Sequence, residues 1–213
     1  NTTFNSTSIR GTGAAADVTL ADWDYDPDGN LSTNLIAYWK FDEATSSNNR
    51  SDYRGNNNLA TNSTIERVEG VREGAANFTR SRVQYLNISD NADLSTGNID
   101  FTIAAWVYID SFTGVSMYIV SKRDSGTNSE REYAFGNQGE GGPSVKFFLD
   151  TWTSTGVLSE ALGTLQASTA TWYFVVAWHD ADANTINIQV NNGAVDSATA
   201  DAAGPGDSTG AFR

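Results

Sequence analysis

Apolar residues alternate with a two-residue period along several short stretches, and this pattern constrains the fold more than any other feature of the sequence. The stretch 172–180, WYFVVAWHD, alternates in this way and is followed by the polar turn 181–185 and by INIQV at 186–190. Side chains point alternately to the two faces of a β-strand, so these residues predict two strands joined as a β-hairpin. The stretch 101–109, FTIAAWVYI, also alternates, and both of its faces are largely apolar. It therefore predicts a central strand that is covered on both sides.

Other short apolar stretches are separated by clusters of Gly, Asn, Ser and Asp, and a helical period is not sustained anywhere. These stretches begin at Leu35, Ala75, Val83, Met117, Glu132 and Val145. Many short strands joined by such turns predict an all-β fold, an antiparallel sandwich or barrel. The length of 213 residues suits one large all-β domain.

The charge balance and the missing cysteines exclude several classes of function. There are 26 acidic and 13 basic residues, which gives a net charge of −13. A field of this sign repels nucleic acid and anionic lipid surfaces. With no cysteine, the chain has neither disulfides nor thiolate metal ligands. We therefore expect no nucleic-acid partner, and the sequence has no apolar run long enough for a membrane span.

The order of several segments resembles a known family. LIAYWKFDEA at 35–44, DYRGNNNLA at 52–60 and GVREGAANF at 70–78 are similar to the opening of a LamG-like, concanavalin A-type jelly-roll domain. The stretch 85–110 resembles that family's central signature, and IVSKRD, TWYFVVAWHD and INIQVNNG follow in the expected order. The resemblance implies a two-layer antiparallel β-sandwich of the concanavalin A-like jelly-roll type over residues 35–213. Residues 1–34 are then an N-terminal extension or linker.

Residues 210–212 look like the start of one more strand. The resemblance implies two closing strands after this point, so we expect a C-terminally truncated domain with unpaired strand edges that need a cover. Two interpretations stay open. In one, the chain is shortened and the sandwich tolerates an open edge. In the other, DVTLADW at 17–23 supplies a strand within its own chain or to a neighbouring copy, and the protein is a self-associating structural subunit of an extracellular or viral appendage.

The sequence argues against catalysis. The fold that the resemblance implies is also that of retaining glucanases. These enzymes need two carboxylates ~5 Å apart, usually on alternating residues of one strand. No such Glu-x-Asp-x-Glu run is present, and the acidic pairs at 130 and 132 and at 180 and 182 lie beside turns. His179 is the only histidine, and its apolar strand predicts a packed side chain instead of a catalytic base. We expect a non-catalytic protein, with a glycoside hydrolase as the weaker alternative.

Two loops are candidate calcium sites. Asp24, Asp26 and Asp28 precede Gly29 at the spacing of a hard-cation loop, but position twelve of that loop is Leu35 instead of a bidentate Glu. An acidic turn in a linker is the alternative.

The second candidate follows from the resemblance, since members of the family hold calcium at the rim through the loop after the first strand. The matching residues are Asp52, Gly55 and Asn57, with Asp42 and Glu43 just upstream. A plain solvated loop is the alternative here.

Glycan recognition is what the resemblance implies for function, through loop aromatics that stack on sugar faces and amides that bind hydroxyls. The candidates are Tyr53, Asn56, Asn58 and Trp152. Trp152 lies among small polar residues with no evident core strand, which predicts an exposed ring, although a ring folded over the sandwich edge is the alternative. We therefore expect an extracellular binding module, at a cell or virion surface and within a larger surface or adhesion protein, that recognises a glycan or glycoprotein with or without calcium.

Overall fold

The computed structural model describes residues 34–112, 114–124, 130–139 and 144–213. Regular structure in these ranges consists of β-strands and two 3-10 turns, Arg80–Arg82 and Ala92–Leu94, with no α-helix. The strands are β1 (Asn49–Arg50), β2 (Leu59–Thr61), β3 (Glu66–Glu69), β4 (Gly74–Asn77), β5 (Leu86–Asn87), β6 (Phe101–Tyr108), β7 (Met117–Arg123), β8 (Arg131–Gly139), β9 (Val145–Trp152), β10 (Leu158–Leu162), β11 (Trp172–Asp180), β12 (Thr185–Val190) and β13 (Val195–Thr199). The predicted all-β class is confirmed.

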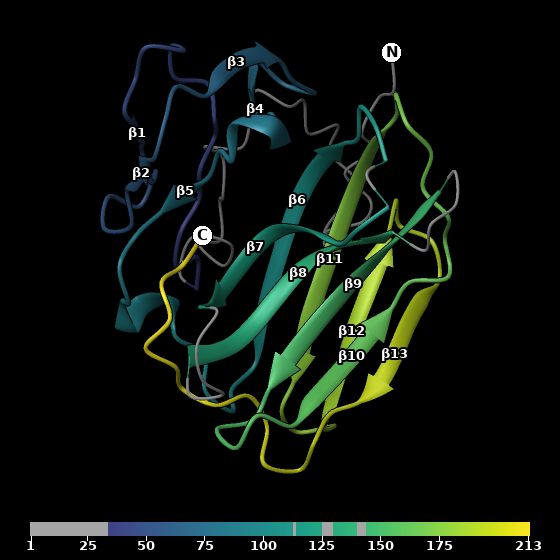
Figure 1. Ribbon diagram of the computed structural model, residues 1–213. Helices are drawn as coiled ribbons and strands as arrows, with labels where there is room; N and C mark the ends of the chain where they lie inside the picture. The colour runs from purple at the N-terminus through teal and green to yellow at the C-terminus, as the bar shows by residue number, and fades with distance from the viewer. Residues whose placement is uncertain (1–33, 113, 125–129, 140–143) are drawn as a thin grey trace, which may run out of the picture.

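Two antiparallel sheets of four strands form the body of the molecule. The front sheet has the order β10-β9-β8-β7, and the back sheet has the order β13-β12-β11-β6. The two sheets lie one behind the other in Figure 1. The predicted hairpin is the β11–β12 pair, whose register places Trp178 opposite Asn187. The predicted two-layer antiparallel sandwich is therefore confirmed.

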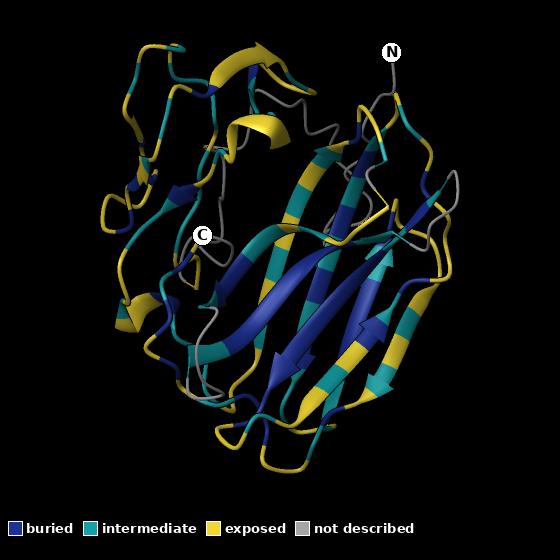
Figure 2. Ribbon diagram, in the orientation of Figure 1, coloured by how far each residue is buried: buried dark blue, intermediate teal, exposed yellow. Residues whose placement is uncertain are grey.

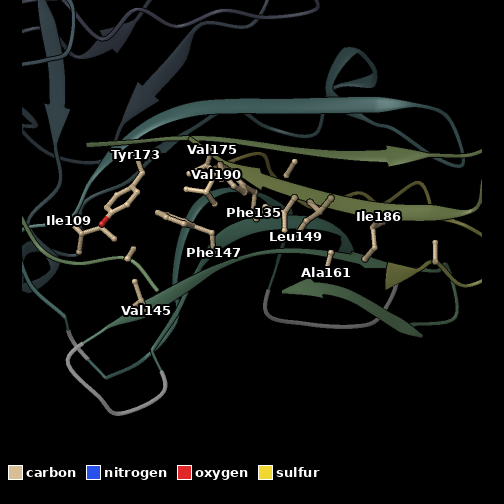
Figure 3. Packing of buried hydrophobic residues seen from close by; sticks show 14 residues of the cluster. Ile109, Phe135, Val145, Phe147, Leu149, Ala161, Tyr173, Val175, Ile186 and Val190 are labelled. Atoms are coloured by element: carbon tan, nitrogen blue, oxygen red, sulfur yellow. The ribbon is translucent and has the colours of Figure 1, made fainter. Parts of the chain in front are cut away.

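The main core lies between the two sheets. Phe135, Phe147 and Leu149 of the front sheet are fully buried, and they pack against Val175 and Ile188 of the back sheet. Figure 3 shows Phe135, Phe147, Leu149 and Val175 meeting between the layers. Burial of one such side chain stabilises a fold by about 1.5–3 kcal/mol, so the alternating inward residues hold the layers together.

The prediction that 101–109 is a central strand is wrong for the described part of the chain. Among the described strands, β6 pairs only with β11 and lies at the edge of the back sheet. Its outward residues are exposed, including Trp106 at 37% and Tyr108 at 42%. The Trp106 ring lies against Phe174 of β11 and the Tyr108 ring against Trp172 of β11, with centroids 5.2 and 5.3 Å apart. The apolar residues on the outer face therefore pack against the neighbouring strand and not against a third layer. Figure 2 shows the alternation along β6 and the deeper burial of β8 and β9.

A smaller unit lies beside the sandwich. It contains the sheet β1-β2-β5, the pair β3-β4 and a second core around Leu59, Ile65 and Leu86. The stretch from Leu35, predicted as a strand, forms only an isolated bridge between Trp39 and Asp52. The predicted strand from Val83 is reduced to β5, because Val83 adopts a left-handed conformation with φ of 50°.

The C-terminal residues join this smaller unit to the front sheet. Phe212 forms β-bridges with both Ile88 and Lys122, and the backbone of Arg213 exchanges hydrogen bonds of 2.8 Å with Ser121. The segment 210–212, predicted to begin a strand, therefore pairs with one backbone segment on each of its two sides. Figure 1 shows the C-terminus between β5 and β7. Residues 17–23, which we considered as a strand donor, lie outside the described residues.

A buried charge cluster fixes the same junction. Lys122 and Glu132 are both 0% exposed, and Lys122 Nζ lies 3.1 Å from Glu132 Oε2 and 2.8 Å from Asp90 Oδ1. The Lys122 ammonium also donates to the carbonyl of Ser208. Glu132 accepts from the hydroxyl of Thr96 at 2.8 Å and from the backbone N–H of Ser208 at 3.2 Å. The cluster connects β7, β8, the 90–97 loop and the C-terminal segment.

We predict that Lys122→Met lowers the free energy of unfolding by about 3–5 kcal/mol, because it leaves the Glu132 carboxylate buried without a counter-charge. Urea denaturation at pH 7 measures this loss. Arg82→Met is the matched control, since the Arg82–Glu66 pair is exposed at 56% and 50% and such pairs contribute about 0–1 kcal/mol. Equal effects of the two substitutions would contradict the role of the cluster.

Candidate functional site

A rim loop that follows β1, residues 52–58, is organised around the carboxylate of Asp52. This side chain is buried, with Oδ1 accepting from the backbone N–H of Tyr38 at 2.8 Å and of Arg54 at 3.0 Å. Oδ2 accepts from the backbone N–H of Asn57 at 3.1 Å. A single carboxylate therefore fixes both ends of the loop.

The same contacts set the charge of Asp52. Burial by itself would raise the pKa of this carboxyl, but the backbone N–H groups of Tyr38, Arg54, Asn57 and Asn56 outweigh it and hold the pKa below its usual value of 3.8. Asp52 is therefore anionic at neutral pH. The hydrogen bonds that hold the loop are charge-assisted, which makes them stronger than neutral ones.

The two asparagines beside Asp52 also have structural partners. Asn57 is 0% exposed, and its Oδ1 accepts from Asn91 Nδ2 at 2.7 Å. The indole N–H of Trp39 donates to the carbonyl of Asn57 at 2.8 Å. Asn58 Oδ1 accepts from the backbone N–H of Asp52 at 2.8 Å. The loop is consequently a rigid unit attached to the second core.

The structure brings Asp52 and Asn57 together, but their oxygens accept from N–H donors. Upstream, Glu43 Oε1 accepts from the backbone N–H of Ser51 at 2.6 Å. Within the described ranges, no group of three or more His, Cys, Asp or Glu side chains is placed to hold a metal ion. Calcium at this loop stays a prediction. The other candidate ligands, Asp24, Asp26 and Asp28, lie outside the described residues.

Tyr53 presents an aromatic ring at the surface of this loop. The side chain is 57% exposed, and Lys40 Nζ lies 4.8 Å from the ring centroid. The Tyr38 ring meets it edge to face, with centroids 6.2 Å apart. Asn56, on the same loop, is exposed. A small hollow of about 50 Å³ lies next to Tyr38 and Lys40 and is also lined by Asp42, Arg72 and Glu73. Tyr38 and Lys40 therefore connect the exposed Tyr53 ring to a small hollow lined by charged groups.

The predicted exposed ring of Trp152 is wrong. Trp152 is the last residue of β9 and is only 6% exposed, because the core strand extends through a stretch that the sequence suggested was a loop. The ring packs with Ala134 and Phe148, and the Arg123 guanidinium lies 5.3 Å from its centroid. Trp152 thus belongs to the front sheet and lies apart from the Tyr53 loop in the chain and in the fold.

An acid pair on the front sheet was missed by the sequence reasoning. Asp150 of β9, which is buried, and Glu160 of β10, which is exposed, lie directly opposite each other in the register of the two strands. Burial and then the Glu160 charge raise the pKa of Asp150 to about 7, partly offset by Arg123. The two acids come from different strands, whereas the sequence pattern of glucanase carboxylates places both acids on one strand.

His179 is packed as the sequence predicted. It is 1% exposed, its Nδ1 lies 2.9 Å from the carbonyl oxygen of Ile99, and its ring lies 5.8 Å from that of Phe101. This environment is typical of a core histidine. Nothing about its described contacts indicates a base next to a nucleophile.

The stacked antiparallel sheets and their irregular rim define a jelly-roll sandwich of the lectin type. A laminin G family model, described as "Concanavalin A-like lectin/glucanases superfamily", matches residues 80–213, which is more than half of the chain. The chain belongs to this family, as the sequence resemblance indicated. Its fold supports a carbohydrate-binding type of module, and laminin G-like modules are typically extracellular.

Two further comparisons complete this result. No curated protein matches the sequence. One similar solved structure is the native heptameric SAP-like pentraxin from Limulus polyphemus, with a TM-score of 0.39 and 12% sequence identity. The match covers 52% of this chain and 48% of the pentraxin chain, so the chain spans about half the length of that protein.

Among the described residues, no helix is long and apolar enough to cross a membrane.

We predict that Asp52→Asn lowers the free energy of unfolding at pH 7 by about 1–3 kcal/mol, because it removes the charge that four backbone N–H groups stabilise. Since the folded-state pKa is depressed, this contribution is present above the ordinary value of 3.8 and is lost as the pH falls through the lower folded value. The difference from the wild type should therefore shrink below about pH 4. Urea denaturation from pH 2.5 to 7 measures it.

The exposed Asp93 provides the control, and Asp93→Asn should change stability little at any pH. A constant difference between Asp52→Asn and the wild type across this pH range would show that the charge of Asp52 does not hold the loop.

Proposed function

We propose that this protein is a non-catalytic binding module that recognises a carbohydrate or glycoprotein through the 52–58 rim loop. The observation that carries the proposal is the exposed Tyr53 ring on a loop held by the buried Asp52 carboxylate. An aromatic ring offers a flat apolar face to the C–H groups of a sugar, and neighbouring polar groups bind its hydroxyls. Tyr53, Asn56 and Asn58 supply both kinds of group within one loop.

Rigidity of the loop favours this function. Because the backbone of 52–58 is already fixed by Asp52 and Asn57, binding costs little ordering entropy. Lys40 lies over one side of the Tyr53 ring and places a cation beside any ligand there. Calcium is part of the proposal only as an assisting ion, and its predicted ligands stay those named from the sequence, Asp52 and Asn57 or Asp24, Asp26 and Asp28.

The proposed setting is extracellular, as part of a larger surface or adhesion protein on a cell or virion. A net charge of −13 keeps such an exposed module soluble and away from anionic polymers. The sequence has no Glu-x-Asp-x-Glu run that would place glucanase carboxylates along one strand, which supports a binding role over hydrolysis.

Assembly by strand donation is a second candidate. The observation in its favour is the pairing of Phe212 with both Ile88 and Lys122, since an extended segment fits between these two backbones. Light scattering coupled to size-exclusion chromatography tests it over a range of protein concentrations. A monomer at every concentration would remove this candidate, and a concentration-dependent oligomer would support it.

The test of the binding proposal is a glycan array probed with the wild type and with Tyr53→Ala. We predict that the substitution weakens binding to the glycans that the wild type retains by about tenfold or more, through loss of the stacking ring. The array is run with calcium and with a chelator, which separates an ion requirement from the role of the ring.

Tyr85→Ala is the matched control. Tyr85 is 40% exposed and also has a cation over its ring, with Arg213 at 5.6 Å, but it lies outside the loop. Equal binding by the wild type and Tyr53→Ala, or an equal loss in both variants, would contradict the assignment to the loop.

A further inference from the structure

The Asp150–Glu160 pair occupies a particular place in the front sheet. Residue register places Asp150 of β9 opposite Glu160 of β10 on one side and opposite Ala134 of β8 on the other. Among the described strands β10 is the edge of this sheet, since it pairs only with β9. Any interaction between these two side chains therefore acts on the attachment of an edge strand.

Two carboxyl groups on directly opposite residues can share a hydrogen bond only when one of them carries a proton. Without that proton, two like charges would lie opposite each other in a sheet, which destabilises the pairing of the strands. The pair thus has two states, a protonated one that attracts and an ionised one that repels.

The surroundings offer little compensation for the ionised state. Asp150 is 8% exposed, and no described group hydrogen-bonds to its buried Oδ1. The charged groups acting on Asp150 are Glu160 from β10 and Arg123 from β7, whereas β8 places the uncharged Ala134 opposite it.

Arg123 is the single described cation among these groups, and it is engaged elsewhere. It donates to the Tyr118 hydroxyl at 2.6 Å, and its guanidinium lies 4.7 Å from the Tyr118 ring and 5.3 Å from that of Trp152. It therefore lowers the cost of ionising Asp150 only in part.

We propose that Asp150 and Glu160 form a pH-sensitive latch, in which a shared proton holds the edge strand β10 against β9 and loss of that proton loosens β10. This latch is independent of the Tyr53 loop and adds a response to pH that the proposed binding function does not include. It gives the front sheet a firmly held edge in acidic surroundings and a more open edge in alkaline ones.

The direction of the effect follows from linkage. The pKa of Asp150 is raised by burial and by Glu160 from 3.8 to about 7. The stabilising contribution is therefore complete below the unfolded-state value and declines as the pH rises toward about 7, where it is lost. Asp52 has the opposite dependence, so the two carboxylates can be told apart in one set of measurements.

Hydrogen–deuterium exchange of the full chain tests the latch. We expect the protection factors of the β10 amides, corrected for intrinsic exchange, to fall about ten- to a hundredfold from pH 5 to pH 8 in the wild type. In Asp150→Asn the profile should be flat, because the amide cannot ionise. The amides of β6, the edge strand of the back sheet, serve as an internal reference, and Asp182→Asn serves as the control for removal of an exposed carboxylate.

A direct titration keeps the proposal falsifiable if Asp150→Asn does not fold. Carbon-13 NMR of the side-chain carboxyl groups in the wild type should give a midpoint near 7 for Asp150, and Glu160→Gln should move that midpoint down. A midpoint near 4, or β10 protection that has the same pH profile in the wild type and Asp150→Asn, would overturn the latch.

Discussion

The buried ion pair between Lys122 and Glu132 is the interaction on which the rest of this structure depends. Neither side chain has contact with solvent, and both reach Ser208 of the C-terminal segment. Lys122 also reaches Asp90, and Glu132 also reaches residues 96–97. Two sheets that stack face to face provide the mass of the core, but they do not by themselves fix the segments that run along their rims. A buried charge can do so, because every partner that it loses leaves an uncompensated group in a low-dielectric interior. The segment that ends at Phe212 is held in this way between the front sheet and the smaller unit.

The rim loop is built on the same principle at a second place. The Asp52 carboxylate binds backbone N–H groups from residues on both sides of the loop, and the result is a fixed surface from which the Tyr53 ring projects. The front sheet contains a third buried carboxyl, that of Asp150, but its partner is another acid instead of a set of N–H donors. Asp52 therefore stays ionised at neutral pH, whereas Asp150, with a pKa of about 7, loses its proton only near neutral pH. Asp52 and Asp150 are the same type of residue, so their different pKa values come from their surroundings, which are backbone N–H donors for Asp52 and burial beside another acid for Asp150.

Much of the sandwich could be predicted from the sequence, because alternation in β11 and β12 reports directly which residues face the core. The edge position of β6 could not be predicted, because outward apolar residues that stack on a neighbouring strand give the same sequence pattern as residues covered by a second layer. Neither the left-handed conformation of Val83, which caps the 3-10 turn Arg80–Arg82, nor the single bridge at Trp39 is encoded by the alternation of apolar residues. At the candidate site, the loop around Asp52 was found through family resemblance, but no motif indicated that Asp52 accepts from its own loop and from Tyr38 outside it. The Asp150–Glu160 pair depends on strand register, and Trp152 was misplaced because small polar neighbours hid a core strand.

The central claim is that a rigid rim loop of a lectin-type sandwich is the binding surface. Chemical-shift mapping by two-dimensional NMR, with the whole chain titrated by the highest-ranking glycan of the array, tests this claim most directly. The account predicts that shifts cluster at residues 38–40 and 52–58 and saturate together, with the β8 and β9 amides unmoved. Shifts centred on the face of the front sheet around Tyr118 and Glu160, with the 52–58 amides unchanged, would contradict it.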